Sequence, residues 1–218
     1  MAKPIRYQPF AYFKAGKGVT DPQITHDELQ TELLNLVGKA ELVMFIRAYV
    51  QERTPAAFAS EPMLWESVRE WFAARLQVHP REIGLSGSAQ SGFSLKATNR
   101  GTPFNPNSSD LDLFVVSESY LTRLNRELRA FVSCKSNNHN FSAQIQTVEN
   151  QLRMGYVDLN QIPANHDMYP LLAAAKNDVS IIIDRLKLHN FNLKPSHLRV
   201  YSSWKSLGCW VRRSYSSL

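Results

Sequence analysis

Two short polar motifs have residue types and spacing suited to phosphate and metal chemistry. Gly87-Ser88 follows a short apolar segment, and the missing Cβ at Gly87 would let backbone N–H groups approach a phosphate. The Ser88 hydroxyl adds a further donor. Downstream, Asp110 and Asp112 stand two residues apart beside an apolar run. We therefore expect the first motif to bind an anion and the second to bind cations.

The spacing of the two aspartates suggests how they would bind cations. In a β-strand, residues i and i+2 project from the same face roughly 7 Å apart, at a rise of about 3.3 Å per residue. Carboxylate oxygens are hard ligands that favour Mg²⁺, so Asp110 and Asp112 can hold the same pair of ions. Two such ions about 3.5 to 4 Å apart would activate an attacking oxygen and stabilise a departing pyrophosphate. The pair therefore predicts a two-metal site for Mg²⁺ or Mn²⁺.

Hydrophobic spacing predicts the elements that must position these motifs. Short apolar runs predict strands at residues 83–85 and 111–116, each next to one motif, and further strands at residues 154–159 and 198–201. Thr25 and Glu28 form a capping-box signature, and Pro62 is suited to the first turn of a helix that Pro80 would end. Helical spacing then predicts six helices, at residues 25–37, 41–53, 60–80, 121–132, 169–189 and 204–211.

Length and composition favour one compact unit. With 218 residues, 44% of them hydrophobic, the chain can bury one domain core but not two of ordinary size. We expect one domain over residues 1–218, with an N-terminal arm and helices (1–80), a core that carries both motifs (81–160) and a basic helical part (161–218). No apolar stretch approaches the roughly 20 residues that span a bilayer, and the N-terminus lacks a signal-peptide pattern. A cytoplasmic protein with no membrane partner is the expectation.

Positive charge is concentrated in the last third of the chain. Residues 151–218 hold nine Lys or Arg against four Asp, whereas the net charge of the whole chain is +6. Binding to a polyanion such as RNA would explain this excess, and so would a solvated helix face with a basic tail. The cations expected to face an RNA are Lys194, Arg199, Lys205, Arg212 and Arg213.

The order of the two motifs resembles the nucleotidyltransferase fold of the DNA polymerase β superfamily, in which Gly-Ser ends one strand and Asp-x-Asp lies on the next. The resemblance covers residues 83–116 clearly and, more loosely, the preceding helix, the following helix and residues 155–159. It implies an α/β (α+β) fold, with a small mixed sheet flanked by helices and with helical N- and C-terminal extensions. It also implies that Gly87 and Ser88 hold a nucleoside triphosphate while Asp110 and Asp112 hold Mg²⁺.

The sequence departs from the family pattern between the two motifs. Twenty-one residues separate Ser88 from Asp110, where family members have nearer to about a dozen. Residues 93–107 are therefore expected to form an inserted hairpin or flap at the mouth of the site, or a solvated loop. Within this segment, Lys96 and Arg100 are the candidates for contact with the nucleotide.

The second departure concerns the third carboxylate of the family, which has no clear counterpart in this sequence. Active family members place one on a neighbouring strand, commonly as the base for the incoming hydroxyl. Asp158, which lies between apolar residues, is the candidate for this base and third metal ligand. Asp184 is the alternative, although its setting favours a helix with a surface ion pair. The strand expected at residues 198–201 holds no acid.

The resemblance implies a Mg²⁺-dependent enzyme that transfers a nucleoside monophosphate from an NTP such as ATP to an RNA, for example tRNA, or to a protein hydroxyl. Small bacterial enzymes of this fold occur in toxin–antitoxin and phage-defence systems, where an antitoxin or defence protein would be a partner. Two alternatives stay open. One is a catalytically silent module that binds RNA or a protein. The other is a cyclic-oligonucleotide synthase, although only 106 residues follow Asp112 to form its large helical domain.

Overall fold

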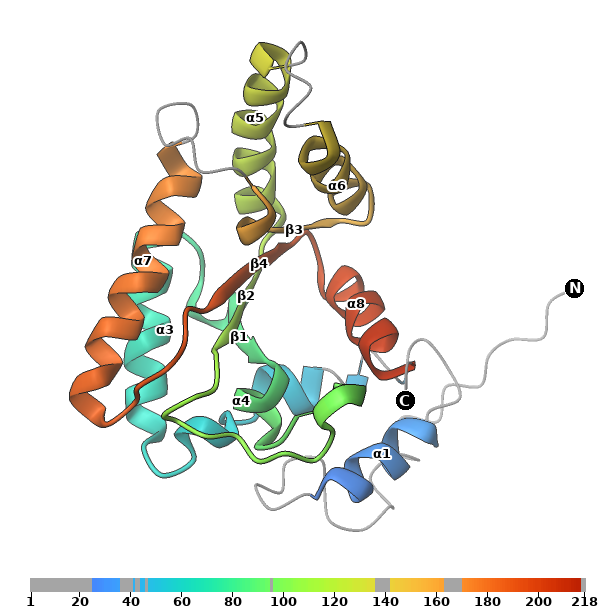
Figure 1. The fold of residues 1–218 in the computed structure, drawn as a ribbon, viewed down its shortest axis with the longest axis vertical. Helices are drawn as coiled ribbons and strands as arrows, with labels where there is room; N and C mark the ends of the chain where they lie inside the picture. Colours follow the sequence, from blue (N-terminus) through green and yellow to red (C-terminus); the bar gives the residue numbers. More distant parts are fainter. Residues whose placement is uncertain are drawn as a thin grey trace, which may run out of the picture.

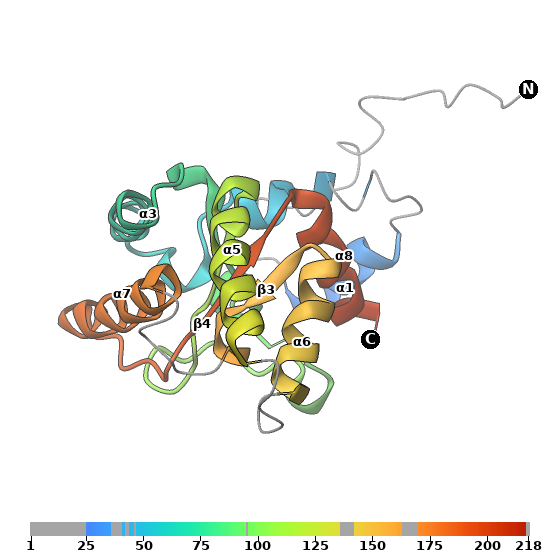
Figure 2. The same cartoon turned by 90° about the horizontal axis from the view of Figure 1, so that it is seen from above.

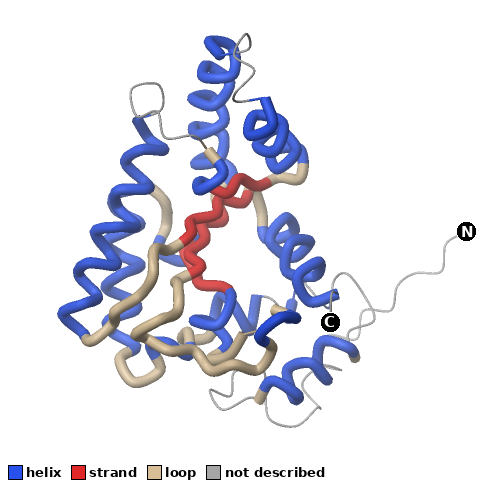
Figure 3. Tube along the Cα trace, viewed as in Figure 1, coloured by secondary structure: helices blue, strands red, loops and turns tan. Residues whose placement is uncertain are grey.

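The computed structural model describes residues 25–35, 41, 44–45, 47–94, 96–135, 142–162 and 170–216. Within these ranges, helices surround one four-stranded mixed sheet, which confirms the expected α/β class (Figure 1). Figure 3 shows the strands, in red, at the centre with helices on either side. No helix in the described part of the chain is long and apolar enough to cross a membrane.

The sheet has the strand order β1-β2-β4-β3. β1 (Ile83–Ser86) runs antiparallel to β2 (Asp112–Val116), and β2 runs parallel to β4 (His197–Tyr201). β3 (Tyr156–Asp158) pairs antiparallel with the other side of β4. All four strands fall where the apolar runs predicted them. β4 nevertheless belongs to the part of the chain that was expected to be a helical extension, so the sheet takes strands from both sides of residue 160.

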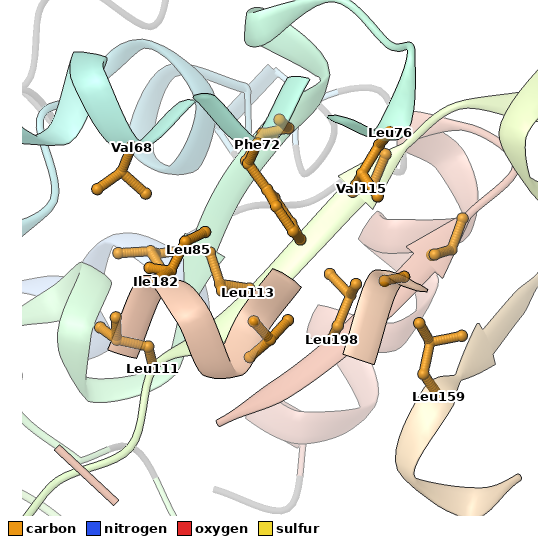
Figure 4. Packing of buried hydrophobic residues seen from close by; sticks show 14 of the residues in the cluster. Val68, Phe72, Leu76, Leu85, Leu111, Leu113, Val115, Leu159, Ile182 and Leu198 are labelled. Carbon is orange, nitrogen blue, oxygen red and sulfur yellow. The ribbon is translucent and has the colours of Figure 1, made fainter. Parts of the chain in front are cut away.

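A large apolar core covers one face of the sheet. Leu113 and Val115 of β2 contribute to it, together with buried residues of α3 (Pro62–Leu76), α5 (Glu118–Lys135) and α7 (Pro170–Leu186). Figure 4 shows this packing, with side chains of α3 pointing toward the strands. We call this the large-core face. Its burial anchors β2, and with it the start of the strand that carries Asp112.

The opposite face has a smaller, aromatic core. Because side chains alternate along a strand, Phe114 of β2 and Tyr201 of β4 point to this side, where their rings lie 6.3 Å apart. α8 (Trp204–Ser216) and the π-helix η2 (Arg47–Glu52) pack on it. Figures 1 and 2 both show α3 and α7 on one side of the sheet and α8 on the other. We call this side the α8 face.

α1 (His26–Leu34) and α3 begin where the sequence predicts, whereas α3 ends earlier than predicted. At α1, the N–H of Thr25 donates to Glu28 Oε2 at 2.8 Å and the N–H of Glu28 to Thr25 Oγ1 at 3.3 Å, which confirms the capping box. α3 begins with Pro62, as expected, but ends at Leu76 rather than at Pro80. The reason is Gln77, whose left-handed backbone (φ 56°) caps the helix early.

The longest helix that lacked a prediction is α6 (Ser142–Arg153). This helix is polar overall, and the signal that could have found it is a short apolar stripe at helical spacing, Ile145, Val148 and Leu152. α6 supports β3, because Gln151 Oε1 accepts a hydrogen bond from the N–H of Asp158 at 2.9 Å. The sequence also predicts a loop at residues 135–142 and a helix cap at residues 165–167; of these, residues 136–141 and 165–167 lie outside the described residues.

Candidate phosphate and cation site

A cavity of about 510 Å³ opens on the α8 face, beside the start of β2. β1 ends where β2 begins, since the two strands are antiparallel and Ser86 pairs with Asp112. The end of β1 leads into the short helix α4 (Gly87–Ser91). Five of the six residues predicted for the site line this cavity: Gly87, Ser88, Lys96, Asp110 and Asp112.

Gly87 and Asp112 join the two motifs physically. The backbone of Gly87 has φ +67°, a left-handed conformation that favours glycine. A Cβ at this position would collide with Oδ2 of Asp112. The turn therefore favours glycine, and a Cβ here would also require the Asp112 carboxylate to move.

Asp110 lies before β2, which corrects the expectation that both aspartates project from one strand. β2 starts at Asp112, and at this start the N–H of Leu113 donates to the carbonyl of Leu111 at 3.0 Å, which makes a tight turn around Asp112. Leu111 is fully buried, and its N–H donates to Ser196 Oγ at 3.1 Å. The turn is thus anchored, and both carboxylates still reach the cavity.

The charge of Asp112 is affected by burial and by its neighbours. Burial raises the pKa of this carboxyl above its ordinary value, and Arg199 opposes that shift. The negative charge of Asp110 raises the pKa further, whereas Lys96 and His197 lower it. Two like charges that interact in a partly buried cavity favour the binding of a cation close to both.

The oxygen ligands fit a divalent cation in part. The carboxylates of Asp110 and Asp112 and the hydroxyl of Ser88 are hard oxygen donors of the kind that Mg²⁺ and Mn²⁺ prefer. Within the described ranges, no three His, Cys, Asp or Glu side chains lie close enough together to hold one ion. The protein therefore offers two carboxylates, and further ligands would come from water or from substrate phosphates.

Asp158 is not brought to the cavity as the third carboxylate. β4 lies between β2 and β3, and Arg199 of β4 lies between Asp112 and Asp158. Its Nε donates to Asp158 Oδ2 at 3.1 Å, and its Nη1 lies 3.5 Å from Asp112 Oδ1. Asp158 Oδ1 also accepts from the N–H of Asn160 at 3.0 Å. The predicted third ligand is instead an ion-pair partner of Arg199.

Asp184, the alternative third carboxylate, is far from this arrangement. It lies on α7, which packs on the large-core face, and its side chain is 70% exposed. Its Oδ1 accepts a hydrogen bond from Lys187 Nζ at 2.8 Å. The surface ion pair favoured by the sequence is confirmed, and Asp184 is not among the residues that line the cavity.

The insertion between the motifs forms a hairpin-like flap, as predicted. Phe93 and Pro103 form an antiparallel bridge, and the N–H of Ser94 donates to the carbonyl of Thr102 at 2.7 Å. Lys96 lies in this flap and lines the cavity. Arg100, the other candidate for nucleotide contact, is not among the residues that line it.

Several residues of the cavity were not predicted for it, and most of them lie far from both motifs in the sequence. His197 pairs with Asp112 across the parallel strands, and its Nδ1 lies 2.9 Å from Asn160 Nδ2. Trp210 of α8 covers Arg199, with the guanidinium 4.6 Å from the ring centroid. The polar-apolar alternation of residues 197–201 is the signal that could have put His197 and Arg199 on one face. The other unpredicted lining residues include Tyr49 and Gln90.

The cations expected to face RNA are divided by the structure. Lys194 and Arg199 line the cavity. Lys205 is exposed on α8 but does not line it. The side chains of Arg212 and Arg213 lie outside what the structure describes.

No family model, curated protein sequence or solved structure matches this chain. The chemistry assigned to the cavity therefore depends on the residues that line it. These combine a glycine turn, two carboxylates and three basic side chains, Lys96, Lys194 and Arg199, in one hollow on the α8 face.

Proposed function

We propose that this protein is a nucleotidyltransferase that depends on a divalent cation and transfers a nucleoside monophosphate from an NTP to a hydroxyl of RNA or protein. The observation that carries the proposal is the contact between the two motifs, in which the Asp112 carboxylate lies against the Gly87 turn in a shared cavity. A triphosphate with about four negative charges needs both hydrogen-bond donors and cations, and the cavity contains residues suited to both.

Each lining residue has a role in this proposal. Backbone N–H groups at Gly87 and the Ser88 hydroxyl bind phosphate oxygens. Asp110 and Asp112 hold Mg²⁺ or Mn²⁺, which when bound offsets phosphate charge at the reacting group. Lys96 enters from the flap and contacts the phosphates as well.

His197 is assigned a binding role. Where Asn160 Nδ2 donates to His197 Nδ1, the neutral imidazole carries its proton on Nε2. In that tautomer the Nε2–H group can donate a hydrogen bond. His197 is therefore suited to contact a phosphate oxygen.

The nature of the acceptor is a further part of the proposal. Nine Lys or Arg against four Asp in residues 151–218, with Lys194 at the cavity, favour an RNA such as tRNA over a protein. In the setting implied by the resemblance, the enzyme would act as a toxin or phage-defence effector and would bind a controlling partner protein.

A second candidate is a silent module that binds a nucleotide or RNA without transfer. It is favoured by the position of Arg199, which lies between Asp112 and Asp158 where a third carboxylate would be needed. Retention of the charged pair Asp110 and Asp112 favours the enzyme, because two neighbouring like charges have a cost unless they bind a cation.

One labelling experiment distinguishes these functions. The protein is incubated with each α-labelled NTP, Mg²⁺ and either total RNA or cell lysate, with the double variant Asp110→Asn, Asp112→Asn as the control. Label on an RNA or on a protein, lost in the control, supports transfer and identifies the acceptor. A labelled small product that needs no acceptor indicates a cyclic-oligonucleotide synthase. Nucleotide binding without any labelled product indicates the silent module, and absence of nucleotide binding overturns the proposal.

A further inference from the structure

Arg199 is held more firmly than the other cations of the cavity. Its guanidinium contacts Asp158, Asp112 and the ring of Trp210, and its side chain is only 16% exposed. Burial alone would lower the pKa of Arg199, but the two carboxylates raise it above its ordinary value, so the group stays charged. Lys96 and Lys194, in contrast, are exposed.

Part of this guanidinium remains available to a ligand. Nε is used by Asp158 at 3.1 Å, and the contact of Nη1 with Asp112 is long, at 3.5 Å. Nη2 has no hydrogen-bond partner among the described residues. Since Arg199 lines the cavity, these donors are available to an anion that enters it.

The position of Arg199 bears on how many cations the site can hold. β4 is the direct neighbour of β2, so its side chains on the α8 face are the ones next to Asp112. A site for two divalent ions needs a carboxylate there to hold the second ion. Arg199 puts a positive charge at that place instead, and it also engages Asp158. A second ion would therefore be repelled by the guanidinium and would lack a carboxylate of its own.

On the basis of the proposed function, we propose that the site binds a single divalent cation at Asp110 and Asp112 and that Arg199 binds the triphosphate in place of a second ion. An arginine fork suits this role because it donates two parallel hydrogen bonds to phosphate oxygens. Asp158 and Trp210 act as positioning residues, because they hold the guanidinium in place before the ligand arrives.

The number of bound ions tests the inference directly in the unaltered protein. Mn²⁺ is titrated in the presence of a non-hydrolysable ATP analogue, and bound Mn²⁺ is counted by equilibrium dialysis and examined by electron paramagnetic resonance. One Mn²⁺ per chain, without the spectral signature of two coupled ions, supports the inference. Two coupled Mn²⁺ ions per chain overturn it and leave the proposed transferase standing. Failure to bind both Mn²⁺ and the analogue overturns the proposed function as well.

Binding of inorganic tripolyphosphate without metal tests the role of Arg199. The variant pairs Arg199→Gln with Asp158→Asn, so that Asp158 is not left as a buried charge without its partner, whereas the longer contact with Asp112, at 3.5 Å, is lost. Calorimetry in the presence of a chelator should show that affinity falls about tenfold or more, as expected for the loss of a charge-assisted hydrogen bond. Arg126→Gln makes the same chemical change at an exposed position of α5 outside the cavity and should leave affinity unchanged. Equal affinity in the double variant and the unaltered protein overturns the inference.

Discussion

The carboxylate of Asp112 lies against the backbone of Gly87, so close that no Cβ fits between them. This contact joins the turn after β1 to the start of β2, although 25 positions separate the two residues in the sequence. Phosphate-binding donors and a cation-binding carboxylate therefore face the same cavity. The contact also explains why a single substitution would disturb both motifs.

Gly87→Ala should destabilise the fold and abolish cation-dependent NTP binding. The left-handed backbone costs a residue with a Cβ about 1–2 kcal/mol, which lowers the Tm by roughly 2–8 °C in a chain of this size. In addition, the new Cβ would collide with the Asp112 carboxylate and displace it. Gly101→Ala is the matched control, because Gly101 also has a positive φ (+75°) but a Cβ there would meet no neighbouring atom within 4 Å. Thermal unfolding should show a lower Tm in both variants. Calorimetry should show loss of NTP binding only in Gly87→Ala.

NTP affinity should rise when Mg²⁺ or Mn²⁺ is added, because the carboxylates of Asp110 and Asp112 attract a triphosphate only through a cation. The double variant Asp110→Asn, Asp112→Asn should lose this metal dependence. Asp184→Asn removes one negative charge from the surface of α7 and should keep it. Calorimetric titration of NTP with and without metal checks the prediction. Equal affinity in both conditions for the unaltered protein would rule out a cation at these aspartates.

Asp158→Asn should destabilise the protein by about 3 kcal/mol, because it leaves the largely buried Arg199 guanidinium with a weaker partner. Removal of both charges, in Asp158→Asn with Arg199→Gln, should cost less than the sum of the single changes. Urea unfolding of the single variants and the double variant measures this coupling. Additive effects of the two substitutions would show that the ion pair contributes no stability.

Salt dependence of RNA binding should report the contribution of Lys194. If the acceptor is RNA, log affinity should fall linearly with log salt, and Lys194→Gln should flatten the slope by about one unit across RNA sequences. Lys187→Gln, directly after α7 and outside the cavity, carries the same change in charge and should leave the slope unaltered. Fluorescence anisotropy between about 50 and 200 mM salt makes the comparison. An RNA that binds with no salt dependence would point to a protein acceptor.

Alkaline pH should unfold the protein through its buried tyrosines. Burial raises the pKa of Tyr49 to about 12, and it raises the pKa values of Tyr120 and Tyr201 as well. Below about pH 10 these phenols are neutral in both the folded and the unfolded chain, so stability is unaffected by them. Above that pH only the unfolded chain ionises readily, and stability falls. Absorbance at about 295 nm, where ionised phenols absorb, should show these tyrosines ionising together with unfolding, and Tyr120→Phe should move the transition to higher pH.

Local signals in the sequence determined most of the elements. The capping box at Thr25 and Glu28, the proline that opens α3 and the apolar runs of the strands each depend on residues a few positions apart. The same holds for the Gly-Ser turn and the Asp-x-Asp pair, which could be recognised before any fold was known. Where a weak stripe lay in a polar segment, as in α6, the local signal was too faint for a prediction.

Strand order was decided only by the tertiary structure. Residues 197–201 show by their alternation that they form a strand, but nothing local shows that this strand lies between β2 and β3. That placement depends on how the helices of both faces pack, and it brings Arg199 to Asp112 across 87 positions of the sequence. The apolar residues around Asp158 would suit a strand directly beside β2 as well as they suit the observed strand beside β4. It is the pairing with β4 that puts a guanidinium, and not a third carboxylate, next to the two aspartates.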